Sequence, residues 1–223
     1  RQRQMCIRDR NMPNRLNFLT IVPMFHCNGW CYPWTIPMLN GRTICLRNID
    51  IKKIFELIDK YDVTHFGGAP IVLNMITGAP EADRKKLKNK VYVLTAGAPP
   101  PSIIFKKMKA LGFEVMHVYG LTETYGHVTQ CAWNDEWNDF DEDKQNEIKA
   151  RQGVRYPNTE GVTILDPETM KEVPKDGKTI GEIMIRGNVV MKGYFKDKDA
   201  TDKAMTVSYT HLRAHETRHE GVC

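Results

Sequence analysis

The 223-residue sequence has no uninterrupted apolar run of about 18 residues, the length that a membrane-spanning helix requires. No secretory signal peptide is recognisable near its beginning. It holds 6 cysteines, and their spacings fit no disulfide framework for a chain of this length. Charge of one sign does not dominate, since 32 Lys and Arg stand against 27 Asp and Glu. We therefore expect reduced thiols, no transmembrane segment and no nucleic-acid partner, because that partner requires a basic face.

The two ends of the chain are related through their codons. Residues 5–9 (MCIRD) can be written ATG-TGT-ATA-AGA-GAC, and the reverse complement of that DNA encodes VSYTH, residues 207–211. The match extends by one residue in each direction, and it resembles the inverted transposon end that is used to build sequencing libraries. We therefore expect residues 1–10 and 206–223 to be adapter-derived and non-native. Without them 26 basic and 24 acidic residues remain, a net charge of +2 in place of +5.

Short apolar runs alternate with longer amphipathic ones in the first half of the chain. The short runs predict strands at residues 16–22, 43–46, 63–66, 91–95 and 114–118. The longer runs predict helices at residues 51–60, 101–111 and 146–151. This alternation indicates an α/β fold around a mostly parallel sheet, covering residues 11–152. After residue 153, short apolar runs separated by Asp-Pro and Asp-Gly turns predict a small β-subdomain over residues 153–205.

The stretch VMHVYGLTETYG, residues 115–126, leads from an apolar strand directly into polar groups. Ligands of open α/β sheets collect beyond the carboxyl ends of the strands. At such a place the ring of Tyr119 offers a stacking face, and Gly120 permits close approach of the backbone. Thr122 can donate to a phosphate oxygen, and Glu123 can bind Mg²⁺. For this string alone the plainer alternative, a strand-to-helix turn capped by Thr122, is favoured.

Four further stretches carry recognisable patterns. They are PMFHCNGW (residues 23–30), TAGAPPP (95–101), KARQGV (149–154) and GEIMIRGNVVMKGYFKDKDAT (181–201). Together with Tyr-Gly-x-Thr-Glu at 119–123, they resemble in order and spacing the signature segments of the adenylate-forming (AMP-binding) superfamily, in its acyl-CoA synthetase or acyl-activating branch. The resemblance spans nearly all of residues 11–205. It implies part of the large N-terminal domain of such an enzyme, a mostly parallel sheet flanked by helices, plus a small β-subdomain.

The resemblance also implies a reaction. The leading hypothesis is a medium- or long-chain fatty-acid:CoA ligase, which converts a carboxylic acid and ATP into an acyl-adenylate and pyrophosphate, and then transfers the acyl group to the coenzyme A thiol. The implied cofactors and co-substrates are therefore ATP or AMP, Mg²⁺ and coenzyme A. Because each step moves negative charge, such catalysis depends on positioning and on charge neutralisation.

Carried onto this sequence, the resemblance assigns catalytic roles to Thr122 at the α-phosphate, to Glu123 at Mg²⁺ and to His26. The residues it assigns to nucleotide binding are Gly97, Ala98, Pro99, Tyr119, Gly120, Leu121 and Thr122. It also places His26, Trp30 and Gly120 at the acyl pocket, where Trp30 would act as a gate. As bare sequence features, His26 is equally a structural hydrogen-bonding residue and Trp30 a core aromatic residue.

Three features of the family lie outside this sequence. They are a Gly/Ser/Thr-rich phosphate loop before residue 23, a Thr-Gly-Asp motif after residue 201, and a C-terminal domain with a catalytic lysine. We therefore expect an internal fragment of a longer enzyme, and no ligase activity from the 223-residue chain itself. The expected location is cytoplasmic; organellar targeting, peripheral membrane binding and homodimerisation of the parent enzyme are left open.

Other functions stay open at this stage. The acid could be a benzoate-like aryl acid, or the adenylate could serve oxidative luciferase chemistry. A non-catalytic nucleotide-binding or interaction module is a further alternative. Thr122 and Glu123 are both present, however, which argues against a chain that has lost its catalytic residues. A metal–thiolate site at Cys27 and Cys31 is the weakest alternative, since no second ligand pair completes a tetrahedral set.

Overall fold

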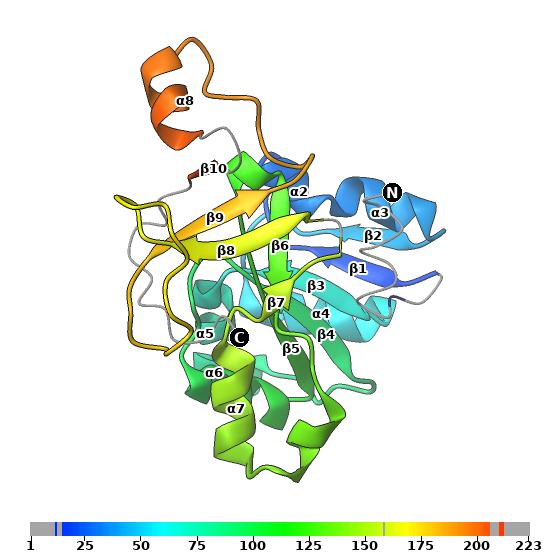
Figure 1. Cartoon of the computed structure of the whole chain (residues 1–223). Coiled ribbons are helices and arrows are strands. Elements are labelled where there is room, and N and C mark those ends of the chain that lie inside the picture. The colour runs from blue at the N-terminus through cyan, green and yellow to red at the C-terminus, as the bar shows by residue number, and fades with distance from the viewer. Residues whose placement is uncertain (1–11, 13–14, 158, 206–209, 212–223) are drawn as a thin grey trace.

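A computed structural model of the chain describes residues 12, 15–157, 159–205 and 210–211, the last two by their backbone alone (Figure 1). Its main feature is a seven-stranded sheet in the order β2-β1-β3-β4-β5-β6-β7. The strands are β1 (Asn17–Thr20), β2 (Arg42–Cys45), β3 (His65–Gly68), β4 (Val91–Thr95), β5 (Phe113–Leu121), β6 (Gly126–Gln130) and β7 (Val154–Arg155). Strands β1 to β5 are parallel, and β6 and β7 pair antiparallel. The predicted α/β class with a mostly parallel sheet is confirmed.

Helices occupy the connections between the strands. They are α2 (Cys27–Trp30), α3 (Tyr32–Met38), α4 (Ile51–Tyr61), α5 (Pro70–Gly78), α6 (Ser102–Ala110), α7 (Glu142–Ala150) and α8 (Lys198–Ala204), with short 3₁₀ turns η1 (Glu81–Asp83), η2 (Thr122–Thr124) and η3 (Asp135–Asp139). Helix α4 begins where expected because the Asp50 carboxylate accepts from the Lys53 amide at 2.8 Å. Within the described residues, every helix is too short or too polar to cross a bilayer.

The predicted strands overlap the observed ones. The strand expected at 16–22 is shorter as β1, and two further differences follow. The strand expected at 63–66 is displaced, since β3 begins at His65. Strand β5 continues beyond the expected 114–118 to Leu121 because its last residues pair with β6. The second difference moves the carboxyl end of β5 to the polar residues of the 119–123 motif.

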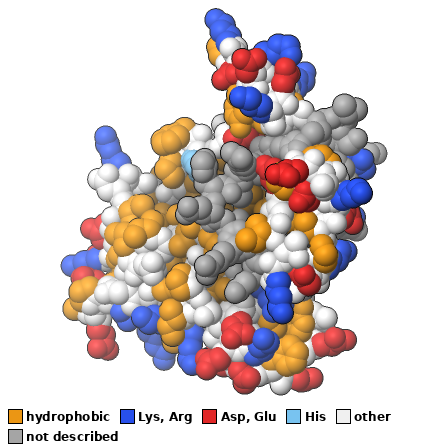
Figure 2. All heavy atoms as spheres, turned by 60° about the vertical axis from the view of Figure 1, so that its left-hand side comes forward, with side chains coloured by type: hydrophobic (Ala, Val, Ile, Leu, Met, Phe, Trp, Pro, Cys, Tyr) orange, Lys and Arg blue, Asp and Glu red, His pale blue; other side chains and the backbone are white. Residues whose placement is uncertain are grey.

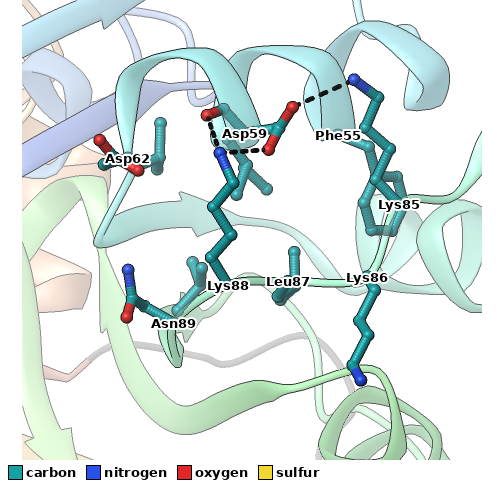
Figure 3. Close-up of a pocket in the computed structure, with 11 residues that line it drawn as sticks. Phe55, Asp59, Asp62, Lys85, Lys86, Leu87, Lys88 and Asn89 are labelled. Carbon is teal, nitrogen blue, oxygen red and sulfur yellow. Dashed lines mark hydrogen bonds and ion pairs between the residues drawn. The ribbon is translucent and has the colours of Figure 1, made fainter.

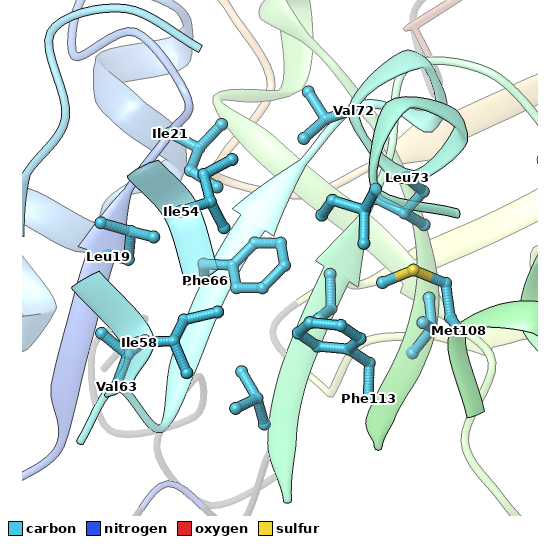
Figure 4. Close-up of a cluster of buried hydrophobic side chains, with 14 of the residues drawn as sticks. Leu19, Ile21, Ile54, Ile58, Val63, Phe66, Val72, Leu73, Met108 and Phe113 are labelled. Carbon is cyan, nitrogen blue, oxygen red and sulfur yellow. The ribbon is translucent and has the colours of Figure 1, made fainter. Parts of the chain in front are cut away.

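Strand residues alternate between the two faces of the sheet. Leu19 and Ile21 pack with α4, α5 and α6 in the larger core cluster. Phe18 and Val22 pack on the opposite face with residues of α2 and α3. In the larger cluster the Phe66 ring lies 5.9 Å from that of Phe113 (Figure 4). Both faces of the sheet are therefore covered, and each fully buried side chain of this kind stabilises the fold by about 1.5–3 kcal/mol.

A second, three-stranded sheet has the order β10-β9-β8. Strands β8 (Gly161–Leu165) and β9 (Glu182–Arg186) pair antiparallel in the region expected to form a β-subdomain, whereas β7 of that region pairs with β6 of the large sheet. Strand β10 (Thr210–His211) pairs with β9 and lies inside the segment expected to be adapter-derived. The origin of that segment and the boundary at 152/153 stay predictions, and residues 1–10 lie outside the described part.

Candidate functional site

The motif at 119–123 forms a corner between two antiparallel strands. Strand β5 ends at Leu121, η2 makes one turn, Tyr125 adopts a left-handed conformation with φ of 52°, and the chain returns as β6. The hydroxyl of Thr124 closes this turn, because it accepts from the Leu121 amide at 2.9 Å and donates to the Gly126 carbonyl at 2.9 Å. The alternative of a strand-to-helix turn capped by Thr122 is therefore wrong. The Thr122 side chain stays exposed, as binding a phosphate oxygen requires.

Gly120 permits the close backbone contact on which this corner depends. A Cβ atom at this position would lie 1.8 Å from the carbonyl oxygen of Gly126 and 2.7 Å from the Cα of His127. A real Cβ atom cannot come that close to another backbone. The pairing of β5 with β6 also shifts register between Tyr119 and Gly120. Glycine is therefore required here to fold the hairpin, in addition to any contact with an acyl group.

The segment after β1 folds into a left-handed turn beside the corner. Cys27, Asn28, Trp30 and Cys31 all have positive φ, between 44° and 65°, as does Gly29 at 61°. Each such non-glycine residue costs about 1–2 kcal/mol, so the surrounding contacts must hold the turn in place. The Sγ atom of Cys27 lies 3.6 Å from the Thr122 hydroxyl, and the thiol of Cys31 donates to the Tyr125 carbonyl at 3.9 Å. In Figure 1, α2 and the corner accordingly lie next to each other.

His26 and Trp30 occupy the two ends of this turn. His26 directly precedes α2 and is exposed. Trp30 is only 8% exposed, and its ring would lie 3.1 Å from a Cβ atom built on Gly67 of β3. The ring also meets the His127 imidazole edge-on at 5.0 Å between centroids. Trp30 therefore packs as a core aromatic residue in this structure, and its role as a gate stays a prediction.

The predicted adenine loop follows the neighbouring strand. Gly97, Ala98 and Pro99 come after the end of β4 and are exposed, and Gly97 has a positive φ of 97°. Strands β4 and β5 are parallel and adjacent, with Thr95 opposite His117. Because the carboxyl ends of parallel strands meet at one edge of a sheet, the loop and the corner open toward the same edge.

Tyr119 and Glu123 determine the electrostatics of the corner. The Tyr119 hydroxyl is buried without a hydrogen-bond partner among the described residues. Burial, assisted by the charge of Glu123, raises the pKa of Tyr119 to about 12. The Glu123 carboxylate accepts from the Tyr194 hydroxyl at 3.0 Å. Burial and this hydrogen bond raise the pKa of Tyr194 further above its ordinary value.

Glu123 has the chemistry of a magnesium ligand. Across the described ranges, no group of three or more His, Cys, Asp or Glu side chains is arranged to hold a metal ion. Mg²⁺, however, is commonly bound by one or two carboxylates together with substrate phosphates and water. The contact from Tyr194 engages Oε1 of Glu123. A half-buried carboxylate with its other oxygen available beside an exposed hydroxyl fits that mode of binding.

Two residues of this site are not expected from the sequence. Cys27 is expected there only as a candidate zinc ligand, and Tyr194 has no expected role within the 181–201 stretch. In the sequence, the position of Cys27 next to His26 is the available sign that it lies at the site. For Tyr194 that sign is the Gly-Tyr pair at 193–194. Neither signal reveals a contact, because each residue meets a partner at least 71 positions away.

A small cavity lies away from this site, between α4 and the segment that precedes β4 (Figure 3). Asp59 forms ion pairs there with Lys88 at 2.7 Å and with Lys85 at 3.2 Å. Because β4 begins here, the cavity is at the amino end of the strands, opposite the candidate site. On the face in Figure 2, Lys and Arg side chains stand among Asp and Glu side chains. Asp59 therefore neutralises part of the positive charge that Lys85 and Lys88 bring to this cavity.

The fold is that of the N-terminal domain of adenylate-forming enzymes. The N-terminal domain of FACL13 from Mycobacterium tuberculosis superposes with a TM-score of 0.75 at 22% identity, covering 94% of this chain and 51% of that one. The o-succinylbenzoate CoA synthetase MenE from Bacillus subtilis, solved in complex with ATP and a magnesium ion, superposes with a TM-score of 0.74 at 18% identity, covering 94% and 41%.

Sequence comparison identifies the family. Residues 2–195 match the family described as AMP-binding enzyme, and the chain belongs to that family. It is 50% identical over 196 residues to the acetate/butyrate–CoA ligase AAE7, peroxisomal, of Arabidopsis thaliana, covering 87% of this chain and 34% of the relative. It is 45% identical over 198 residues to the 2-methylpropanoate–CoA ligase CCL4 of Humulus lupulus, covering 89% and 35%. The chain thus spans about a third of the length of these curated relatives.

Proposed function

We propose that this chain is an internal part of an AMP-forming acyl-CoA ligase that activates a carboxylic acid with ATP and transfers it to coenzyme A. The observation that carries the proposal is the exposed Thr122 hydroxyl beside the half-buried Glu123 carboxylate, at the sheet edge that also receives the 97–99 loop. Identities of 45–50% to CoA ligases support the same reaction class. The chain alone is expected to be inactive.

In the proposed reaction the acid carboxylate attacks the α-phosphorus of ATP in line, and pyrophosphate leaves. The Thr122 hydroxyl donates a hydrogen bond to an α-phosphate oxygen and so stabilises the charge that develops there. The ring of Tyr119 and the backbone of Gly97, Ala98 and Pro99 hold the adenine. The coenzyme A thiol then attacks the acyl carbon, and AMP leaves. Positioning of two reactants in one site supplies much of the rate enhancement.

Glu123 would hold Mg²⁺ in this scheme. When bound, the ion neutralises charge on the phosphate oxygens. The remaining residues line the acyl site. His26 and Trp30 border the acyl group, and Gly120 and Leu121 shape the space beside it. The names of the relatives favour short acids such as acetate, butyrate or 2-methylpropanoate over the medium- or long-chain acids of the leading sequence-based hypothesis.

The test is made on the intact ligase, obtained by extending the coding sequence on both sides of this chain. Formation of acyl-CoA is measured with acetate, butyrate, 2-methylpropanoate, octanoate and benzoate. We expect activity with the short acids, and a loss of about 100-fold or more for Thr122→Ala that Thr122→Ser largely restores. A preference for benzoate would favour an aryl-acid ligase, and ATP binding without pyrophosphate release from any acid would favour a non-catalytic module.

The cellular location belongs to the same proposal. We propose a cytoplasmic enzyme, while the name of one relative includes the word peroxisomal. A fluorescent fusion to the intact protein, imaged beside a peroxisomal marker, separates the two locations. Size-exclusion chromatography with light scattering on the same material determines whether the intact ligase is a homodimer.

A further inference from the structure

The stretch 187–201 follows β9 and ends inside α8, and of its residues only Tyr194 has been placed at the site so far. It contains the Gly-Tyr pair at 193–194 and Thr201 in the middle of α8. In Figure 1 this segment runs from β9 to α8 past the amino-terminal end of β6. Two of its groups bond to Glu123, the residue that the proposed function assigns to magnesium.

The backbone of Tyr194 is fixed by Thr201. The Tyr194 amide donates to the Thr201 hydroxyl at 2.9 Å, and that hydroxyl donates to the Asp197 carbonyl at 2.7 Å. Asp197 in turn begins α8, since its carboxylate accepts from the Ala200 amide at 2.9 Å. This side-chain-to-backbone arrangement holds the main chain of Tyr194 in one position relative to α8.

Glycine at position 193 permits this arrangement. Gly193 has a φ of 151°, and a Cβ atom there would lie 2.7 Å from Cγ2 and 2.9 Å from Oγ1 of Thr201. A side chain would therefore displace the threonine from the Tyr194 amide. Gly193 and Thr201 are therefore needed for the same reason, because together they fix the position of Tyr194.

The fixed tyrosine reaches across to the corner. Its hydroxyl donates to Oε1 of Glu123 at 3.0 Å, although the two residues are 71 positions apart. From the same segment, the Met191 amide donates to the Glu123 carbonyl at 2.7 Å. Both the main chain and the side chain of Glu123 are thus held by one segment, and Oε2 of the carboxylate takes part in neither contact.

We propose that Tyr194 is a positioning residue that fixes the Glu123 carboxylate so that its second oxygen binds the magnesium ion of the ATP complex. The inference rests on the proposed function. A ligating carboxylate is commonly hydrogen-bonded by a neighbouring group, and removal of such a partner lowers metal affinity by about 10–100-fold. An unrestrained glutamate side chain must lose rotamer freedom when it binds the ion, and a pre-oriented one has already lost it.

The experiment uses the intact ligase carrying Tyr194→Phe, with Tyr92→Phe on β4 as the matched control. Tyr92 is exposed on the sheet and loses the same hydroxyl away from the corner. Activity is measured against Mg²⁺ concentration at saturating ATP and acid. For Tyr194→Phe we expect the half-saturating Mg²⁺ concentration to rise about tenfold or more, with kcat restored at high Mg²⁺ and an unchanged KM for the acid. Tyr92→Phe should match the wild type.

A second readout is independent of turnover. Binding of Mn²⁺ in place of Mg²⁺, in the presence of a non-hydrolysable ATP analogue, is measured by electron paramagnetic resonance. Tyr194→Phe should lower Mn²⁺ affinity about tenfold, Thr201→Val should do so to a smaller extent, and Thr201→Ser should restore the wild-type value.

The outcomes separate the two proposals. A wild-type ligase that adenylates no carboxylic acid overturns the proposed function, and this inference with it. An active wild type with an unchanged Mg²⁺ and Mn²⁺ dependence in Tyr194→Phe overturns the inference alone. An equal loss of activity at every Mg²⁺ concentration also overturns it, because the contact would then serve only the fold of the 187–201 segment.

Discussion

The thiol of Cys27 lies 3.6 Å from the hydroxyl of Thr122, although 95 residues separate them in the chain. The contact joins the left-handed turn after β1 to the corner after β5. Both belong to the carboxyl edge of the parallel sheet, but β3 and β4 lie between their strands. Thr122 is exposed, and the half-buried Cys27 contacts its hydroxyl from a different segment of the chain. The size of residue 27 should consequently control access to the Thr122 hydroxyl.

We therefore expect Cys27→Phe to impair nucleotide binding. The ring would occupy the space beside the Thr122 hydroxyl, and the KM for ATP of the intact ligase should rise about tenfold or more. Cys27→Ser, which keeps the size and a hydrogen-bonding group, should stay within about threefold of the wild type. Cys45→Phe, at an exposed position on the edge strand β2, is the control for adding a ring elsewhere. An unchanged KM for ATP in Cys27→Phe would contradict the proximity of residue 27 to the Thr122 hydroxyl.

The corner itself should be intolerant of a side chain at Gly120. We expect Gly120→Ala to lower the free energy of unfolding by about 3 kcal/mol, because the new methyl group would overlap the Gly126 carbonyl 1.8 Å away. Gly78→Ala is the matched control, since nothing lies within 4 Å of a Cβ atom at the end of α5. The measurement is urea denaturation of the 223-residue chain. Equal stability of the two variants would argue against the close pairing of β5 with β6.

The parallel part of the fold could be predicted from sequence because its signals are local. The strands pack on both faces, so they appear as short apolar runs, and α4 shows an apolar stripe behind a capping aspartate. The antiparallel return through β6 was not predicted. Residues 126–130 follow a polar turn that the Thr124 hydroxyl closes by donating to the Gly126 carbonyl. The pairing of β6 with β5 depends on this contact, which the hydrophobic periodicity of the sequence does not reveal.

The site could be predicted in its residue types but only partly in its geometry. The hydroxyl and carboxylate at 122 and 123 were expected at a strand end, and they lie there. The run of positive φ from Cys27 to Cys31 was not expected, since cysteine and tryptophan rarely adopt this conformation. Tertiary contacts impose it, among them the packing of Trp30 over Gly67. Local propensity therefore cannot place residue 27 beside residue 122.

Variants of Tyr119 test whether its side chain binds the nucleotide by stacking of the ring or by a hydrogen bond from the hydroxyl. Its hydroxyl is buried without a partner among the described residues, a condition that costs about 1 kcal/mol or more. We expect Tyr119→Phe to raise the free energy of unfolding by about 1 kcal/mol and to leave ATP affinity within about twofold, because the ring that we propose to stack on the adenine remains. Tyr119→Ala should lower both. Calorimetric titration with ATP and urea denaturation measure the two quantities, and a large loss of ATP affinity in Tyr119→Phe would show that the hydroxyl binds the nucleotide.

His117 should make the stability of the fold sensitive to mild acid. It is buried on β5, and its Nδ1 lies 2.8 Å from the Ala150 carbonyl and 3.0 Å from the Arg151 carbonyl at the end of α7. Burial lowers the pKa of His117 below the usual 6.5, although the two backbone contacts oppose the shift. The unfolded chain therefore takes up this proton first as the pH falls. Stability should be complete above about pH 6.5 and decrease below it until the lowered pKa is reached.

The decrease is expected to be at most about 1.4 kcal/mol for each pH unit inside that window. Carboxylates titrate mainly below about pH 4.5, so the interval from pH 6.5 to 5 reports mainly on the histidines, and a variant must assign the change to His117. Urea denaturation of the 223-residue chain at several pH values measures it. His117→Gln, which cannot be protonated, should flatten the dependence, whereas His26→Gln at an exposed position should retain it. A dependence that persists unchanged in His117→Gln would assign the acid sensitivity to another buried group.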